Sequence, residues 1–84
     1  MAAQSFTMSY EQVKSEVIRA LRNAGSKGIT SMRLFDEVTG RRKMSVATEG
    51  GIAVKIDDAI RELADKGMVV IDTEYDTYRY KIKR

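Results

Sequence analysis

The sequence predicts an α+β fold in which three helices precede a β-hairpin, and three observations support this prediction. Apolar residues recur at helical spacing in three separate segments before residue 67. Lys66-Gly67 ends the third segment, and the hydrophobic run 68–73 follows at once. After a polar turn at 74–77, residues 78–83 alternate between apolar and basic side chains, which is the period of a strand.

Length and composition indicate one folded domain with a modest core: 84 residues, of which 43% are hydrophobic and 32% charged. We expect residues 1–8 to be a flexible N-terminus and residues 9–84 to form the domain. No apolar run approaches the roughly 20 residues that span a bilayer, and the N-terminus lacks the pattern of a secretory signal. We therefore expect an intracellular protein, in the cytoplasm or nucleoid or in the nucleus, without a membrane partner.

The chain contains no cysteine and no histidine. Disulfides, zinc sites built from these residues and Ser-His catalysis are therefore excluded. No pairing of a nucleophile with a base is visible, and a core this small rarely encloses a catalytic pocket. We expect no enzyme activity, no catalytic residue, no cofactor and no metal.

The first helix is predicted from about Tyr10 to Ala24. Ser9 and Gln12 have the spacing of a capping box, and Gly25 supplies the stop. Ile29 is expected to form a short first strand, and Thr30 is a suitable N-cap for the helix that follows. One apolar face of the first helix is formed by Val13, Val17, Ala20, Leu21 and Ala24.

The second helix is predicted over Ser31–Val38, with Gly40 after its end. Its buried side is expected to hold Met32, Leu34, Phe35 and Val38, and the methionines are expected to fill gaps in the core.

Two interpretations remain open for residues 41–51. The Gly50-Gly51 pair favours a flexible loop or a turn. The alternative is an additional short turn of helix after Ser45.

The third helix is predicted over Ala53–Lys66, with Gly67 as the left-handed stop. Its apolar positions are expected to be Val54, Ile56, Ala59, Ile60, Leu63 and Ala64. In the hairpin, Val69 and Ile71 share one face of the first strand. In the second strand, Tyr78, Tyr80 and Ile82 share a face that is expected to join the core.

Basic residues gather in two places. One is the run Arg41-Arg42-Lys43, and the other comprises Arg79, Lys81, Lys83 and Arg84. Such clusters attract polyanions through counterion release, and they can equally be ordinary solvated surface. On the second strand, the basic residues could instead protect a sheet edge from aggregation.

The end of the third helix carries a family pattern. Leu63, Lys66, Gly67 and Met68 fit the sequence Leu-x-x-Lys-Gly-hydrophobic, and Gly28-Ile29-Thr30 fits an entry from a short strand into a capped helix. Together with the order of elements, these residues resemble the winged helix-turn-helix superfamily over nearly the whole chain.

The resemblance implies binding of double-stranded DNA, with the third helix in the major groove and the hairpin as the wing. It suggests a small transcriptional regulator or a chromatin or replication accessory factor, active as a homodimer through the first helix or the outer strand. The nucleic-acid-binding residues that it implies are Arg33, Arg41, Arg42, Lys43, Ser45, Thr48 and Lys55.

The third helix and the wing also carry acidic residues, which favour an alternative. Asp57 and Asp58 lie where bases would be read, and the wing tip holds Glu74 and Asp76. Carboxylates there repel phosphates. The alternative function is a winged-helix protein-protein interaction module that uses this acidic surface for a protein partner.

Overall fold

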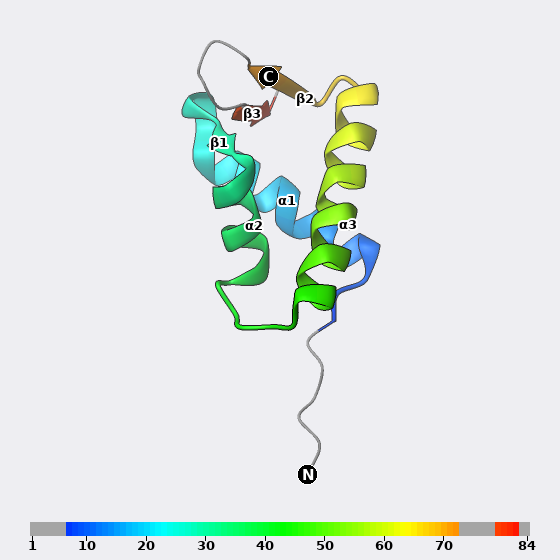
Figure 1. The fold of residues 1–84 in the computed structure, drawn as a ribbon. Helices are drawn as coiled ribbons and strands as arrows, with labels where there is room; N and C mark the ends of the chain where they lie inside the picture. The colour runs from blue at the N-terminus through cyan, green and yellow to red at the C-terminus, as the bar shows by residue number, and fades with distance from the viewer. Residues whose placement is uncertain (1–6, 73–78, 83–84) are drawn as a thin grey trace.

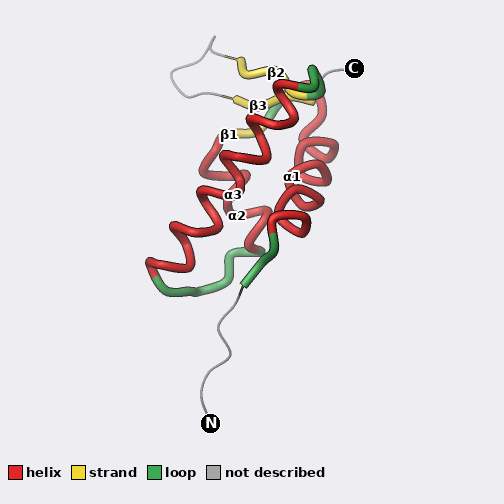
Figure 2. Tube along the Cα trace, turned by 90° about the vertical axis from the view of Figure 1, so that its right-hand side faces the viewer, coloured by secondary structure: helices red, strands yellow, loops and turns green. Residues whose placement is uncertain are grey.

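The computed structural model describes residues 7–72 and 79–82, and it confirms an α+β arrangement. Within these residues lie three α-helices and a three-stranded antiparallel sheet. The helices pack together, the sheet closes one end of the molecule, and the turn between the second and third helices lies at the other end (Figures 1 and 2). The elements are α1 (Tyr10–Ala24), a 3-10 turn (Gly25–Lys27), β1 (Ile29–Thr30), α2 (Ser31–Thr39), α3 (Val46–Asp65), β2 (Val69–Asp72) and β3 (Arg79–Ile82).

The start and end of α1 confirm the sequence prediction. The Ser9 hydroxyl accepts a hydrogen bond from the Gln12 backbone N–H at 3.2 Å, and the Gln12 side chain accepts one from the Ser9 backbone N–H at 2.9 Å. This capping box satisfies two N–H groups that have no partner within the helix. Met8, just before the cap, packs against the core.

Helix α2 begins and ends as predicted, and the short strand before it is present. Thr30 caps the helix by accepting the Arg33 N–H at 3.3 Å. Gly40 ends it in the left-handed conformation, at a φ of 66°. Met32 was predicted to be buried, and this prediction is wrong: the side chain is 78% exposed. It lies on the outer side of the first turn, while Leu34 and Val38 face inward.

Helix α3 is longer than predicted, because it begins at Val46 rather than at Ala53. Residues 46–51 are helical, so of the two open interpretations the one with helix after Ser45 is the correct one for them, although this helix is continuous with α3 and not a separate turn. Gly50 and Gly51 lie inside the helix. The predicted burial of Val54 is also wrong, since that side chain is 61% exposed. Residues two apart on a helix point in nearly opposite directions, so Val54 and the buried Ile56 cannot share a face.

The sheet has the strand order β1-β3-β2, with both pairings antiparallel. Strand β3 is therefore central. The expectation that its basic residues protect an outer edge of the sheet is wrong where β3 pairs with β1, at Arg79 and Tyr80. Tyr80 lies opposite Ile29 on one side and opposite Ile71 on the other, and it packs against the core as predicted. Ile71, predicted to share the inward face with Val69, is 47% exposed.

The predicted turn at 74–77, its acidic tip and the aromatic side chains Tyr75 and Tyr78 lie outside the described residues, as do Thr73, Lys83 and Arg84. Among the methionines, Met68 is 38% exposed, whereas Met8 and Met44 pack against the core.

The hydrophobic core lies between the three helices and the sheet. Helix α1 packs on both α2 and α3, and the inner side of the sheet contacts α1 and α3. The buried apolar residues are Val13, Val17, Ala20, Leu21, Ile29, Leu34, Val38, Ile52, Ile56, Ala59, Ile60, Leu63 and Val69. This layout is compatible with a winged helix.

Candidate nucleic-acid interface

The basic turn, which comprises Arg41, Arg42 and Lys43, connects α2 to α3 at the end of the molecule opposite the sheet (Figure 1). All three residues are exposed. Arg41 follows Gly40 in the left-handed region, at a φ of 59°, so the chain turns away from α2 over two consecutive residues. The Arg41 N–H donates to the Asp36 carbonyl at 3.2 Å, and the Arg42 N–H donates to the Thr39 carbonyl at 3.4 Å. The backbone therefore fixes the start of the turn.

Ser45 and Thr48, both predicted to contact nucleic acid, form the N-terminal cap of α3. The Ser45 hydroxyl accepts the Thr48 N–H at 3.2 Å and donates to the Thr48 hydroxyl at 2.9 Å. These bonds explain why α3 begins at Val46, because a serine cap satisfies a backbone N–H of the first turn. Both hydroxyls lie beside the basic turn, but their first role is to hold the helix end.

Arg33 and Lys55 lie apart from the basic turn. Arg33 is in the first turn of α2, and the rise from Arg33 to the last residue of the helix, Thr39, is roughly 9 Å, with Arg41 beyond that end. Lys55 is partly buried, and its ammonium donates to the Met8 carbonyl at 2.5 Å. That bond ties α3 to the residues before α1. The structure thus gathers Arg41, Arg42, Lys43, Ser45 and Thr48 at one end and separates the other two.

The outer face of α3 is a feature that the sequence prediction missed. Its first half exposes small apolar side chains and glycines together with the carboxylate of Glu49, and its second half exposes charged side chains. Val46 is 85% exposed, and Val54 is 61% exposed. This outer face comprises the exposed residues of the helix, which are Val46, Ala47, Glu49, Gly50, Gly51, Ala53 and Val54 in the first half and Asp57, Asp58, Arg61 and Asp65 in the second. Arg61 and Asp57 form an exposed ion pair at 3.1 Å. The cap sequence Ser45-x-x-Thr48 was the signal that could have revealed this face.

A polar cluster holds the second half of α3 against α1. The Lys14 ammonium and the Tyr10 hydroxyl both donate to the Glu62 carboxylate, at 2.5 Å and 3.2 Å. The hydrogen bond from Lys14 is the main cause that lowers the pKa of Glu62, and the same bond raises the pKa of Lys14. Desolvation, followed by the nearby Glu62 carboxylate, raises the pKa of Tyr10. The cluster fixes the orientation of α3 and hence of its outer face.

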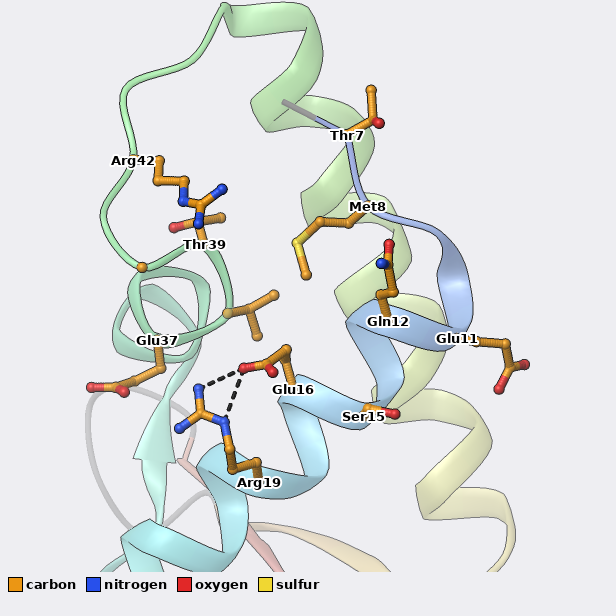
Figure 3. Close-up of a pocket in the computed structure, with 12 residues that line it drawn as sticks. Thr7, Met8, Glu11, Gln12, Ser15, Glu16, Arg19, Glu37, Thr39 and Arg42 are labelled. Atoms are coloured by element: carbon orange, nitrogen blue, oxygen red, sulfur yellow. Dashed lines mark hydrogen bonds and ion pairs between the residues drawn. The ribbon is translucent and has the colours of Figure 1, made fainter. Parts of the chain in front are cut away.

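A broad groove separates α1 from the end of α2 (Figure 3). Arg42 lies at its rim, and three acidic side chains line it: Glu11, Glu16 and Glu37. Arg19, also in the groove, donates two hydrogen bonds to Glu16, at 2.9 Å and 2.5 Å. The excess of carboxylates makes this groove a poor site for a phosphate backbone.

No protein-family model matches this chain, and no curated protein matches it. Within residues 7–72 and 79–82, no three acidic side chains gather in a way that could hold a metal ion. None of the described helices is long and apolar enough to cross a membrane.

Proposed function

We propose that this chain is a winged-helix protein that binds double-stranded DNA, as a small transcriptional regulator or a chromatin or replication accessory factor. Its role is binding rather than catalysis. The basic turn holds phosphates, and the first half of α3 approaches the major groove. The order of helices and strands, with β3 central in the sheet, is compatible with this family.

The observation that carries the proposal is the position of the basic turn. Three exposed cations are separated by two residues from Val46, where a 20-residue helix begins. The unpaired N–H groups and the dipole of such a terminus also favour anions, so both features attract phosphate at the same place.

The first half of the outer face of α3 supports close approach to a groove. Apart from Glu49, its exposed side chains are small, and a Cβ atom placed on Gly50 or Gly51 would contact nothing within 4 Å. Valine and alanine can contact thymine methyl groups, but they offer no hydrogen bond to a base edge. We therefore propose binding that depends mainly on phosphates and shows weak sequence preference.

The proposal is tested by the fluorescence anisotropy of a labelled mixed-sequence duplex, titrated with the protein at several salt concentrations. We expect the Arg42→Ala, Lys43→Ala double variant to bind more weakly to every sequence. The slope of log affinity against log salt should become shallower by roughly 1 to 2.

The matched control removes two cations at the sheet end of the molecule, as Arg22→Ala with Lys66→Ala. Net charge is then the same in both variants, and only the position differs. Equal affinities for the two double variants would show that the basic turn has no special role, and absence of binding at low salt would reject DNA as the ligand.

The second candidate function is a protein-protein interaction module. Asp57 and Asp58 are exposed on the same outer face of α3, and they oppose phosphate there. If a basic protein partner docks on this surface, Asp57→Lys with Asp58→Lys should abolish its capture. A gain in DNA affinity by that variant would follow from charge alone and would not decide between the two functions.

A further inference from the structure

Ser45 is the serine of this chain that follows the densest run of cations. Arg41, Arg42 and Lys43 are three of the four residues before it. Each of the other serines and threonines has at most one basic residue among the four that precede it. A serine kinase with an acidic substrate cleft selects its substrates by such a pattern, because carboxylates of the cleft pair with cations near the reacting hydroxyl. The sequence therefore distinguishes Ser45 from every other serine and threonine.

The backbone around Ser45 suits entry into the cleft of an enzyme. Residues 42–45 belong to no helix or strand, and Ser45 itself is extended, at a φ of -71° or less negative; its printed angles are a φ of -67° and a ψ of 157°. Its side chain and the three cations before it are exposed. Met44 packs against the core but is only partly buried. The segment can therefore lie extended in a cleft once the Met44 side chain leaves the core.

The hydrogen bonds of the Ser45 hydroxyl are local and compatible with phosphorylation. The hydroxyl accepts the Thr48 N–H at 3.2 Å and donates to the Thr48 hydroxyl at 2.9 Å. A phosphate monoester keeps an acceptor for that N–H, and the Thr48 hydroxyl can in turn donate to a phosphate oxygen. The cap of α3 is thus preserved in the modified chain.

We propose that Ser45 is the acceptor of a serine kinase with an acidic substrate cleft, and that its phosphorylation releases the basic turn from DNA. The Ser45 oxygen attacks the γ-phosphorus of a nucleoside triphosphate bound to the kinase. The bond from that phosphorus to the oxygen that bridges it to the β-phosphorus breaks, the nucleoside diphosphate leaves, and a carboxylate of the kinase takes the hydroxyl proton. The release of DNA rests on the proposed function, whereas the modification itself does not.

A phosphate on Ser45 changes the charge of the basic turn directly. It brings about 1.5 to 2 negative charges at neutral pH to a place beside three cations. It also repels a DNA phosphate where the N-terminus of α3 would otherwise attract one. Glu49, exposed in the first turn of α3, adds to this repulsion. Within the chain, the helix dipole and the three cations favour the new phosphate, and Glu49 opposes it.

The modification is tested on the full chain with ATP, Mg²⁺ and a purified serine kinase that accepts basic peptides. We expect mass spectrometry to place one phosphoryl group on Ser45. Ser45→Asn should take up none at this position, and it keeps the cap because asparagine is a good N-cap residue. A peptide of residues 39–50 is the positive control for the kinase. A folded chain that stays unmodified would overturn the proposal, as would a peptide that the kinase refuses or a phosphoryl group on another residue in place of Ser45.

Two double variants test whether the cations select Ser45. Arg41→Gln with Arg42→Gln should lower kcat/KM of the phosphorylation at least about tenfold, since two contacts with the acidic cleft are lost. Arg22→Gln with Lys66→Gln removes the same charge near the sheet and should leave kcat/KM unchanged. Equal values for the two variants would contradict selection by the cations.

The effect on DNA is measured by fluorescence anisotropy at about 0.1 M salt. The phosphorylated chain should bind a mixed-sequence duplex at least about tenfold more weakly than the unmodified chain, with a shallower salt slope. Ser45→Asp and Ser45→Asn test the same effect without a kinase, because both residues cap a helix and they differ by one charge. The aspartate variant should bind more weakly.

Equal affinities of the phosphorylated and unmodified chains would overturn the release of DNA. If neither form binds DNA at low salt, the proposed function fails and the release of DNA fails with it, whereas the mass spectrum still decides whether Ser45 is the acceptor.

Discussion

The two halves of α3 are held in place in different ways. The second half, Lys55–Asp65, contributes four of the five buried residues of the helix, namely Ile56, Ala59, Ile60 and Leu63. Its Glu62 also bonds to two side chains of α1. The first half, Val46–Val54, contributes only Ile52 to the buried set, contains two glycines and depends on the Ser45 cap.

This difference shows that one helix can combine an anchored half with a weakly held one. Most of the stability of a protein helix comes from tertiary packing rather than from intrinsic propensity. The first half has little packing, so we expect it to unfold locally at a lower cost in free energy than the second half. The first half is also the one whose outer face exposes mainly small apolar side chains and glycines.

The largest expected effect comes from the anchored half. Leu63→Ala removes a side chain that is 1% exposed, and truncations of this kind cost about 2–5 kcal/mol of unfolding free energy. Val54→Ala in the first half should change stability by less than about 0.5 kcal/mol, because its side chain lies in solvent. Urea denaturation measures both. Similar losses for the two variants would remove the contrast between the halves.

Removal of the cap should weaken the first half selectively. Ser45→Ala is expected to cost about 1 kcal/mol, since the Thr48 N–H loses its acceptor. Hydrogen exchange should become faster over residues 46–51 and change little over residues 56–65. Ser15→Ala, at an exposed position within α1, is the control and should show no such loss. Faster exchange spread evenly over α3 would indicate that the helix opens as one unit.

A substitution in the opposite direction should strengthen the same half. Gly51→Ala is expected to stabilise the protein by about 0.5–1 kcal/mol, because alanine loses less backbone entropy in a helix and has open space at this position. Thermal unfolding and hydrogen exchange of residues 46–52 are the measurements. A fall in melting temperature would mean that the glycine is needed within the single chain.

The smallest expected effect concerns the cluster of Glu62 with Lys14. The pKa of Glu62 is below its ordinary value of 4.5 in the folded chain, so its contribution to stability is present above pH 4.5 and is lost as the pH falls through the lowered pKa. The pKa of Lys14 is above 10.5, so its contribution is lost as the pH rises through the raised pKa.

Glu62→Gln should therefore have a lower melting temperature at neutral pH and a smaller decrease between neutral pH and acid than the unmodified protein. Lys14→Gln should have a similar effect, and the double variant should add little to either single one. Fully additive effects would show that the two residues do not interact in solution.

Much of the fold could be predicted because its signals are local. Ser9 with Gln12, Thr30 and the glycines at 25, 40 and 67 mark the helix ends through backbone geometry, which acts within a few residues. The alternation of apolar and basic side chains over residues 78–83 likewise predicted the position of β3.

The start of α3 could not be predicted from the glycine pair, because a local cap and a tertiary contact together outweighed the low helix preference of glycine. Two glycines disfavour a helix modestly, whereas the Ser45 cap and the burial of Ile52 favour it. The error at Val54 has another cause, because its spacing of two residues from Ile56 already places it on the opposite side of a helix. Of the candidate site, the exposure of the basic turn followed from its charge. The bond from Lys55 to Met8 depends on how α3 packs beside α1, and no pattern within the sequence indicates it.

The strand order has a consequence for synthesis. Strands β1 and β2 both pair with β3, which comes last of the three along the chain. During translation, the helices and the first two strands leave the ribosome before the strand that joins them. Until residues 79–82 emerge, β1 and β2 lack their shared partner and present unpaired backbone groups. The sheet is therefore completed only after residues 79–82 have left the ribosome.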